Sequence, residues 1–545
     1  MTTSYHIADI RNVALAGHGA SGKTSLADAL LFAGGATTRR GSVDDGTSTF
    51  DIDDEEKRRH FTIDCHLGHF AWNGKQIHII DSPGYPDFIG NALSALAAVE
   101  NVLIAVSGPT GIEVNTRRIF QEATALGLGR LIAITKMDAD NTDYPRDLQA
   151  LRETFGLQCV PFNVPIGQGP SFSGVVDVIK DHENVPPECP LSPVEAYQML
   201  VEQVVEIDEN LMARYLDGEE IGPEELRHAA HDAIAKGLLV PVLCVCTKKD
   251  VGINDLLDLI GECGLSPDDV HRMATEGEGE QAHDVEITPQ EDGTLVAQVF
   301  KTVNDLFMGK MSYLRILSGR MTPETTLVNL RSGKTAKAGH IYMPQGKQND
   351  EVPEAIAGDI VAVVKFDDLH VSDTISNVGG GQSAPSLRVK PIKFPTPMVP
   401  RAVEPKARED EAKISTGLAK IADEDPTFTY RRDAQTHELV ISGMSELHLD
   451  IIQQRLKNRY KLDVNTHVPH VPYLETIAAS AEASHRHKKQ SGGRGQFAEV
   501  HLRVRPRERG AGFHFVDAVK GGVIPNNFIP AVEKGVREQM EKGVI

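Results

Sequence analysis

The sequence predicts a multidomain α/β protein, and three observations lead to this prediction. The 545 residues exceed what one ordinary hydrophobic core can organise, so we expect three to five domains. Short apolar strands alternate with amphipathic helices over roughly the first half of the chain, which is typical of a parallel sheet covered by helices. The second half begins with strands separated by Gly and Pro, and later combines strands with helices again.

A glycine-rich loop near the start of the chain fits the phosphate-binding pattern GxxxxGK[ST]. It follows the apolar strand 13–16 and precedes a helix with an apolar face. Glycines let successive N–H groups face phosphate oxygens, and the following helix adds its positive dipole end. A simple Gly-rich turn is the alternative, but strand, loop and helix are in register. We expect a nucleoside triphosphate to contact Gly17, His18, Gly19, Ala20, Ser21, Gly22, Lys23 and Thr24. Within this loop Lys23 would pair with the β- and γ-phosphates, and Thr24 would hold Mg²⁺.

Two further motifs indicate which nucleotide binds. Thr135-Lys136-Met137-Asp138 follows the apolar strand 131–134, and the Asp138 carboxylate can accept hydrogen bonds from guanine N1–H and its amine, which adenine lacks. Asp81-Ser82-Pro83-Gly84 follows the strand 77–80; Asp81 would reach Mg²⁺ through water, and the Gly84 N–H would sense the γ-phosphate. Each motif is common by chance, but their order, each after its own strand, predicts a GTPase. We also place Cys246 and Thr247 in the nucleotide site.

The composition excludes several classes of protein. A net charge of −21 argues against a nonspecific grip on nucleic acid over the whole surface, so any such contact must be local. The start of the chain lacks a signal-peptide pattern, and no apolar stretch approaches the ~18 residues of a membrane span. The six cysteines show no metal-binding spacing, and Cys244 and Cys246 are expected to be buried thiols on a strand. We expect a cytoplasmic protein without membrane contact.

Two more folding units follow the nucleotide domain. Alternating apolar segments at 295–300, 312–317 and 358–364, with Gly and Pro at hairpin-like intervals, predict a β-barrel. Beyond them, strands and helices from 399 to 464 follow the order β-α-β-β-α-β, which is the ferredoxin-like arrangement.

Four further stretches carry a resemblance to a known family. They are 441–449 (ISGMSELHL), 424–428 (EDPTF), 491–497 (SGGRGQF) and 521–525 (GGVIP). With the three nucleotide motifs, they make the chain resemble translation elongation factor G or one of its bacterial elongation-factor-G-like paralogues.

The resemblance implies a set of domains and ligands. The domains are a P-loop GTPase domain at 1–270 with a helical insert at about 175–237, a translation-factor β-barrel at 284–380, a ferredoxin-like α+β domain at 395–473, and a partial ribosomal-S5-like α+β fourth domain at 474–545. The implied ligands are GTP or GDP, Mg²⁺ and the ribosome. The protein is expected to be a monomer when it is not bound to the ribosome. In the family, more of the fourth domain and a fifth would follow Ile545, so either the chain is truncated or the protein lacks these parts.

The resemblance also assigns roles to single residues. Thr62 would be the switch-one threonine that ligates Mg²⁺ and contacts the γ-phosphate. The catalytic candidates are Lys23, Thr62 and Tyr85. The metal-ligand candidates are Thr24, Thr62 and Asp81. Tyr85 stands where translocases place the histidine that orients the attacking water, and Ala20 replaces an aspartate. Thr135 replaces an asparagine, which should weaken a guanine contact. These departures favour a paralogue over the housekeeping translocase.

Two charged segments have separate interpretations. The acidic run from Asp51 to Glu56 is expected to be a solvated loop face. The segment 484–494 is the one concentrated basic stretch and predicts an RNA contact through Arg486, Lys488, Lys489 and Arg494; a merely solvated loop would look similar.

Three functions remain open from the sequence. The first is a GTP-hydrolysing, ribosome-associated elongation factor. The second is a GTP-dependent ribosome-binding switch that hydrolyses poorly, and the third is a GTP-sensing protein that acts away from the ribosome.

Overall fold

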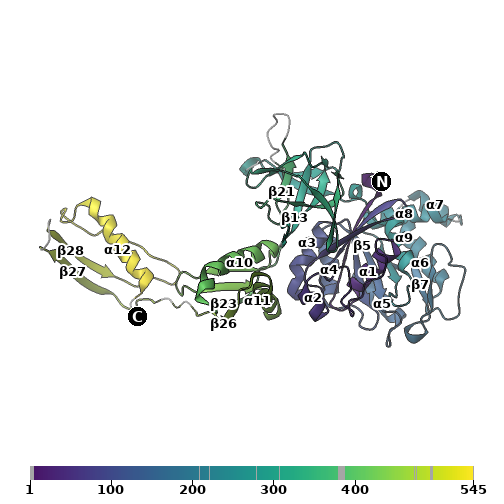
Figure 1. The fold of residues 1–545 in the computed structure, drawn as a ribbon, viewed down its shortest axis with the longest axis horizontal. Helices are drawn as coiled ribbons and strands as arrows, with labels where there is room; N and C mark the ends of the chain where they lie inside the picture. The colour runs from purple at the N-terminus through teal and green to yellow at the C-terminus, as the bar shows by residue number, and fades with distance from the viewer. Residues whose placement is uncertain are drawn as a thin grey trace. The chain divides into compact units, whose positions relative to one another are not determined.

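The fold is described from a computed structural model (Figure 1). It describes residues 5–207, 209–219, 221–277, 279–305, 307–378, 387–471, 473, 475–490 and 495–543. The chain divides into two units. The first comprises residues 1–399, 405–430 and 442–464, and the second comprises 400–404, 431–441 and 465–545.

A seven-stranded sheet with the order β2-β3-β1-β4-β5-β9-β6 forms the nucleotide domain. Neighbours from β3 to β6 run parallel, and β2 is antiparallel to β3. Every residue of β1, β4, β5 and β9 is buried, which explains the apolar runs within them. The strands are β1 (Ile10–Gly17), β2 (His66–Trp72), β3 (Lys75–Asp81), β4 (Asn101–Ser107), β5 (Gly129–Thr135), β6 (Cys159–Pro161) and β9 (Val240–Cys244).

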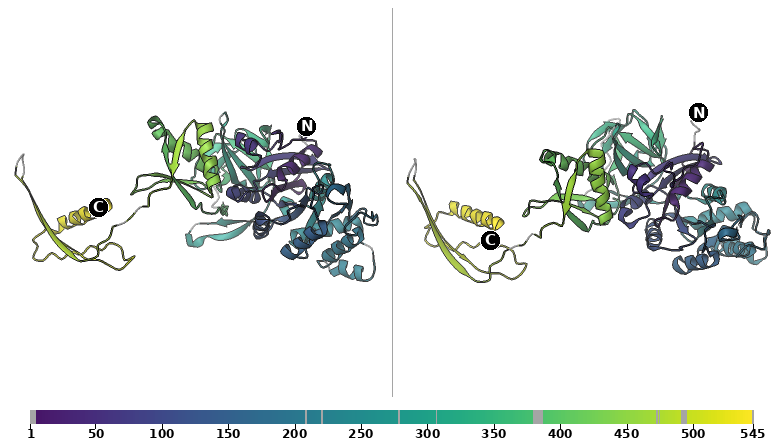
Figure 2. Two further views of the ribbon diagram at one scale, coloured as in Figure 1. Left: turned by 90° about the horizontal axis from the view of Figure 1, so that it is seen from below. Right: turned by 60° about the horizontal axis from the view of Figure 1, so that its bottom comes forward.

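Helices cover the sheet and also form an insert between its last strands. The predicted helical insert is confirmed by α6, α7 and α8, which lie together beside the sheet with the hairpin β7 (Asn163–Ile166) and β8 (Gly174–Asp177) (Figure 2). The helices are α1 (Lys23–Ala33), α2 (Asp54–Arg59), α3 (Ile89–Ala97), α4 (Val114–Ala125), α5 (Tyr144–Phe155), α6 (Pro193–Val205), α7 (Glu209–Leu216), α8 (Pro223–Ala235) and α9 (Ile253–Cys263).

The second domain is all-β, as predicted. Eight antiparallel strands in the order β16-β15-β21-β12-β13-β20-β17-β18 surround one apolar core. Their bounds are β12 (Val296–Asp305), β13 (Gly309–Ser318), β15 (Thr326–Asn329), β16 (Thr335–Lys337), β17 (Ile341–Gln345), β18 (Gln348–Val352), β20 (Ile360–Val364) and β21 (Thr374–Asn377). The smaller sheets beside it contain β10 (Arg272–Glu276), β11 (His283–Ile287), β14 (Arg320–Met321), β19 (Ala355–Ile356) and β22 (Leu387–Val389).

The ferredoxin-like order is confirmed in the third domain. Its sheet has the order β24-β25-β23-β26, so the first strand along the chain lies between the third and the fourth. Ser445 caps the second helix by accepting a hydrogen bond from the His448 N–H at 3.1 Å. The elements are β23 (Val399–Pro405), α10 (Glu411–Glu424), β24 (Thr429–Arg432), β25 (Leu439–Gly443), α11 (Glu446–Tyr460) and β26 (Val464–His467).

The rest of the second unit contains a long hairpin and a helix. The hairpin pairs β27 (Ala481–Lys489) with β28 (Gln496–Val504), and the helix is α12 (Ile529–Lys542) (Figure 1). Among the described residues, no helix has both the length and the apolar character that crossing a bilayer requires.

Candidate functional site

The predicted phosphate loop joins β1 to α1, and its shape requires glycine at two positions. Gly17 has a φ of +137°, and a Cβ there would lie 2.5 Å from the Ala105 carbonyl oxygen. Gly22 has a φ of +88° and precedes the first residue of α1. The buried Lys23 ammonium donates to the His18 carbonyl oxygen at 2.7 Å, and burial lowers its pKa. The loop therefore holds a cation at the place where phosphates are expected.

The three metal candidates come together at this loop. Thr24 Oγ1 donates to Asp81 Oδ2 at 2.7 Å and lies 2.9 Å from Thr62 Oγ1. Burial raises the pKa of Asp81, and within the described part of the chain its Oδ1 atom has no hydrogen-bond partner. Mg²⁺ prefers oxygen ligands and would satisfy this carboxylate, so the residues fit the ion.

The residues around the metal candidates are held by the sheet. In the register of β1 and β3, Leu15 lies opposite Asp81, and the Ser82 hydroxyl donates to the Leu15 carbonyl at 2.7 Å. Pro83 and Gly84 follow as buried residues. A Cβ at Gly84 would lie 2.3 Å from Lys23 Nζ, so this turn closes directly over the phosphate loop.

The predicted base-recognition motif also contacts the phosphate loop. Thr135 Oγ1 donates to the Ser21 carbonyl at 2.6 Å, and Lys136 Nζ donates to the Ala20 carbonyl at 2.7 Å. The Thr135 hydroxyl therefore ties two motifs together, which the sequence did not indicate.

The remaining members of the motif lie beside the next strand. Met137 is fully buried, and Asp138 is half-buried. Burial and then a hydrogen bond with Asp138 raise the pKa of the Cys246 thiol, so the predicted residues Asp138 and Cys246 are neighbours. Thr247 follows as a half-buried residue, and Cys244 and Cys246 are buried thiols, as predicted.

Comparisons with known proteins match the chain along almost its whole length. Family models match residues 8–264 (Elongation factor Tu GTP binding domain), 294–378 (Elongation factor G domain 2), 394–468 (Elongation Factor G, domain III) and 469–545 (Elongation factor G, domain IV). An elongation factor G-like protein of Thermotoga maritima is 36% identical over 98% of this chain and 78% of its own length. An elongation factor G of Dehalococcoides mccartyi is 33% identical over 99% of this chain and 79% of its own length.

The chain belongs to the elongation factor G family. A crystal structure of a Thermus thermophilus protein agrees with this assignment, with a TM-score of 0.84 at 36% identity over 98% of this chain and 78% of the other. The multidomain fold, a GTP-binding domain and an elongation-factor character follow from this membership.

Tyr85, a predicted catalytic residue, lies between the phosphate loop and the segment that contains Thr62. A Cβ at Gly19 would lie 3.2 Å from the Tyr85 ring, and the ring centroids of Tyr85 and Phe61 are 4.8 Å apart. Phe61 directly precedes Thr62. Both rings belong to an apolar cluster with Ile63, Phe88, Leu447 and Ile451. The tyrosine is therefore placed by packing, with its ring near the phosphate loop.

Asn115 of α4 is a site residue that sequence reasoning missed. Its side-chain amide donates to the Gly84 carbonyl at 2.6 Å and so orients the peptide beside the predicted γ-phosphate sensor. No local pattern marks this asparagine, because its partner lies 31 residues away.

The acidic segment before Thr62 is largely buried, part of it in α2, and is not the solvated face that the sequence suggested. Asp51, Glu55 and Glu56 have relative exposures of 1%, 4% and 0%. The prediction is wrong because the chain folds back around Glu56 and because Asp53 pairs with α11. Glu56 accepts hydrogen bonds from the N–H groups of Ile52, Asp53, Ile63 and Asp64 at 2.9 to 3.0 Å, and thereby holds both ends of the segment.

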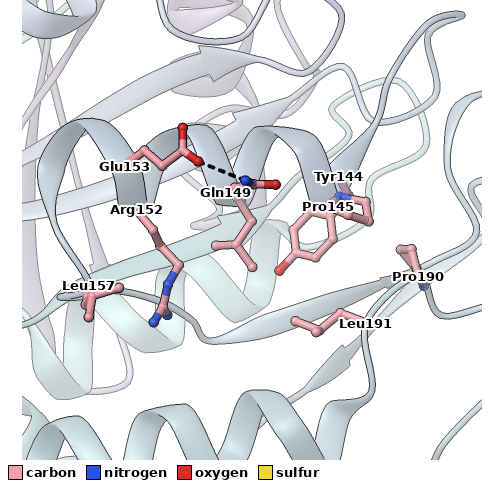
Figure 3. Close-up of a pocket in the computed structure, with 9 residues that line it drawn as sticks. Tyr144, Pro145, Gln149, Arg152, Glu153, Leu157, Pro190 and Leu191 are labelled. Carbon is pink, nitrogen blue, oxygen red and sulfur yellow. Dashed lines mark hydrogen bonds between the residues drawn. The ribbon is translucent and has the colours of Figure 1, made fainter.

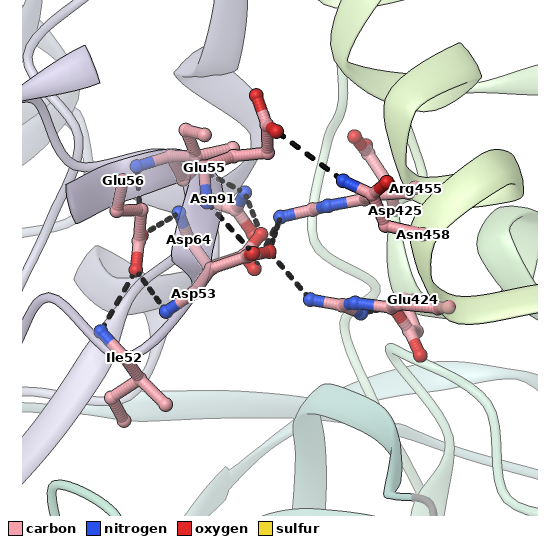
Figure 4. Close-up of polar contacts among 12 residues, drawn as sticks. Ile52, Asp53, Glu55, Glu56, Asp64, Asn91, Glu424, Asp425, Arg455 and Asn458 are labelled. Atoms are coloured by element: carbon pink, nitrogen blue, oxygen red, sulfur yellow. Dashed lines mark hydrogen bonds and ion pairs between the residues drawn. The ribbon is translucent and has the colours of Figure 1, made fainter. Parts of the chain in front are cut away.

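Helix α11 of the third domain contacts this segment through Arg455 (Figure 4) and through Arg459. Arg455 Nη2 donates to Asp64 Oδ2 at 2.6 Å and to Asp53 Oδ2 at 3.3 Å. Arg459 Nη2 donates to the same Asp53 oxygen at 2.6 Å, and its Nη1 donates to Glu424 at 3.2 Å. We call Asp53, Asp64, Glu424, Arg455 and Arg459 the arginine clasp. It joins the third domain to the residues on both sides of Thr62.

Three of the predicted RNA-contact residues, Arg486, Lys488 and Lys489, lie on β27 of the hairpin. Arg486 donates from Nε to Glu499 Oε2 at 2.6 Å, so its charge is partly offset by the opposite strand. Lys488 and Lys489 are exposed. Arg494 lies outside the described residues.

A separate hollow of about 430 Å³ lies over α5 (Figure 3). Its lining includes Tyr144, Leu148, Leu157 and Leu191, and Gln149 donates to Glu153 at 2.8 Å beside it. None of the predicted nucleotide-site residues lines this hollow.

Proposed function

We propose that the chain is a ribosome-associated translational GTPase of the elongation factor G type. It binds GTP with Mg²⁺ and couples its nucleotide state to ribosome interaction during elongation. The observation that carries the proposal is the convergence of Thr24, Thr62 and Asp81 at the phosphate loop.

Nucleotide binding rests on three groups of residues. The loop 17–24 and Lys23 would hold the phosphates, Asp138 with Cys246 and Thr247 would surround the base, and Thr24, Thr62 and Asp81 would hold Mg²⁺, the last through water. Mg²⁺, when bound, would neutralise charge that develops on the phosphate oxygens.

Coupling rests on the short path from Thr62 to the third domain. Asp64 lies two residues beyond Thr62 and is held by Arg455, while Glu56 fixes the backbone between them. A nucleotide state that moves Thr62 would therefore pull on α11 through Asp64. Movement of an ordered switch after loss of the γ-phosphate is a general device of GTPases.

The domain limits remain part of the proposal. We keep 1–270, 284–380, 395–473 and 474–545, with the insert at about 175–237, and the family matches at 8–264, 294–378, 394–468 and 469–545 support them. A cytoplasmic location and a monomeric state away from the ribosome are proposed with them.

A second candidate function is a GTP-dependent ribosome-binding switch with weak hydrolysis. It is favoured by Tyr85, whose ring packs against Phe61, and by Ala20, which carries no charge at the phosphate loop. A GTP sensor that acts away from the ribosome is disfavoured by the basic hairpin of the second unit.

The test measures GTP hydrolysis at saturating Mg²⁺, with and without ribosomes, on the parent chain and on Lys23→Ala. We expect slow turnover alone, stimulation by ribosomes, and loss of GTP binding in the variant. If the chain co-sediments with ribosomes but ribosomes do not stimulate its GTP hydrolysis, the second candidate function, the ribosome-binding switch, would be supported instead. Equal affinity for ATP and GTP would overturn both.

A further inference from the structure

Two histidines and a glutamate cluster where the match to the third family domain ends and the match to the fourth begins. Glu438, His467 and His470 each offer one ligand atom, and these atoms all lie within 4.8 Å of one another. His467 is the last residue of β26, and Glu438 directly precedes β25. The third-domain match ends at 468 and the fourth starts at 469, so the cluster joins residues from both matches. All three residues belong to the second unit.

The Glu438 carboxylate is held in place and faces both imidazole rings. The backbone N–H of His470 donates to its Oε2 atom at 3.0 Å. Its Oε1 atom lies 2.5 Å from His470 Nδ1 and 3.8 Å from His467 Nε2. One oxygen is therefore anchored by the main chain, and the other points between two ring nitrogens.

The protonation of His467 favours a metal ligand. Its Nδ1 atom lies 3.0 Å from the Val468 carbonyl oxygen, which can only accept a hydrogen bond, so Nδ1 carries the proton. In the neutral ring the Nε2 lone pair then faces Glu438 Oε1, at a distance too long for a hydrogen bond. Histidine ligands of metals commonly donate their second N–H to a backbone carbonyl in this way.

The donor set also selects the class of cation. Glu404 of β23 places its Oε1 atom 3.9 Å from His467 Nε2, so it can fill a fourth position that water would otherwise take. Two imidazoles with one or two carboxylates suit Zn²⁺, which is tetrahedral and accepts nitrogen and oxygen ligands. Mg²⁺ and Ca²⁺ prefer all-oxygen sites, so they are disfavoured here.

We propose that Glu438, His467 and His470 bind one Zn²⁺ ion, with Glu404 or water as the fourth ligand. The ion would tie the segment after β26 to the start of β25. It would thereby fix the course of the chain at the start of the residues that match the fourth domain. This site is independent of the nucleotide site and goes beyond the proposed function.

The test titrates the full chain, stripped of metal and free of nucleotide, with ZnCl₂ in a calorimeter. We expect one high-affinity Zn²⁺ site per chain. Glu438→Gln or His470→Ala should lower its affinity for Zn²⁺ at least tenfold, and the double substitution His467→Ala/His470→Ala should abolish binding. Even residues outside a ligand shell alter metal affinity by about 10- to 100-fold, so a lost ligand should exceed that lower bound.

The matched control removes two other exposed histidines that pair with single carboxylates. His271 pairs with Glu286, and His283 pairs with Glu276 at 3.6 Å; in the described structure neither pair belongs to a cluster of three possible ligands. The double variant His271→Ala/His283→Ala should keep the high-affinity site. If it loses Zn²⁺ as strongly as the ligand variants do, the site is overturned.

A second measurement separates this site from binding by cysteine. Co²⁺ in place of Zn²⁺ should give the visible bands of a tetrahedral nitrogen and oxygen site, without the near-ultraviolet thiolate band. These bands should vanish in His467→Ala/His470→Ala while circular dichroism and GTP binding persist. Absence of a one-to-one Zn²⁺ site, a thiolate band, or binding that survives the double substitution would each overturn the proposal.

Discussion

Arg455 of α11 and Asp64 of the segment after Thr62 form a direct ion pair, with Nη2 and Oδ2 2.6 Å apart although 391 residues separate them in the sequence. Arg455 is 4% exposed in its side chain, so the pair is shielded from water. A contact of this kind transmits displacement between segments because breaking it leaves a buried charge without a partner.

The substitution Arg455→Met should release the segment 52–64 from the third domain. Removing one partner of a buried ion pair costs about 3 to 5 kcal/mol, because Asp53 and Asp64 remain buried. We expect faster amide hydrogen exchange across residues 52–64 in the nucleotide-free chain. Lys457→Met on the same helix is the control, since Lys457 is exposed and pairs at the surface with Asp463 at 3.6 Å, a contact worth at most about 1 kcal/mol. Equal exchange in both variants would contradict the role of the arginine clasp.

The pH dependence of the same segment follows from its carboxyl groups. Burial would raise the pKa of Asp53 and of Asp64, but the Arg455 guanidinium holds both below the ordinary value of 3.8. A lowered carboxyl pKa stabilises the folded state above the unfolded pKa, and this stabilisation is lost as the pH falls through the folded pKa. The contribution of Asp53 and Asp64 to the hydrogen-exchange protection of residues 52–64 should therefore be fully present above about pH 4 and be lost as the pH falls further. A loss near neutral pH would point to other groups.

Guanine selectivity should depend on Asp138. In Asp138→Asn the amide can donate to the carbonyl that replaces the guanine amine in xanthine, so preference should shift from GTP toward xanthosine triphosphate. Competition of each triphosphate against a fluorescent GTP analogue measures the shift. Thr135→Val is a useful comparison, because it removes the hydrogen bond to Ser21 and should lower affinity for both nucleotides together. An Asp138→Asn variant that still prefers GTP would exclude this residue as the selector.

Tyr85→His should raise ribosome-stimulated turnover while leaving GTP affinity nearly constant. The imidazole can order a water at neutral pH in a way that a phenol does not, and the smaller ring also loosens the contact with Phe61. Multiple-turnover phosphate release with ribosomes provides the measurement. Tyr85→Phe keeps the packing and removes only the hydroxyl. If Tyr85→His is slower than the parent and Tyr85→Phe slower still, tyrosine is itself the residue that positions water.

Ribosome binding should depend on the charges of the hairpin. Replacing Arg486, Lys488, Lys489 and Arg494 with Ala removes up to four phosphate contacts, each of which contributes about 0.7 to 0.9 to the slope of log K against log salt. Lys488 and Lys489 should account for more of the change than Arg486, because Glu499 already pairs with Arg486. Co-sedimentation over a salt series measures the slope, with Lys534→Ala on α12 as the control. Binding that matches the parent at every salt concentration would show a merely solvated hairpin.

The sequence by itself determined the local parts of this protein. The phosphate loop, the turn at Asp81 and the turn at Thr135 each follow an apolar strand, and a few consecutive residues dictate their shape. The alternation of strands and helices also predicted the order of the domains, because each strand or helix can be recognised from the periodicity of its own residues. The ferredoxin-like order at 399–464 was readable on these grounds.

Only the tertiary structure decided which distant side chains meet. Thr24 contacts Thr62 across 38 residues, Thr135 contacts Ser21 across 114, and Arg455 contacts Asp53 across 402. The acidic run before Thr62 looked solvated because its burial depends on how the chain folds back around Glu56 and on the pairing of Asp53 with α11. Periodicity records how residues lie along one element, whereas a buried charge is stabilised by whichever elements pack against it. Spacing along the chain therefore cannot specify the clasp, the Asn115 contact or the histidine cluster.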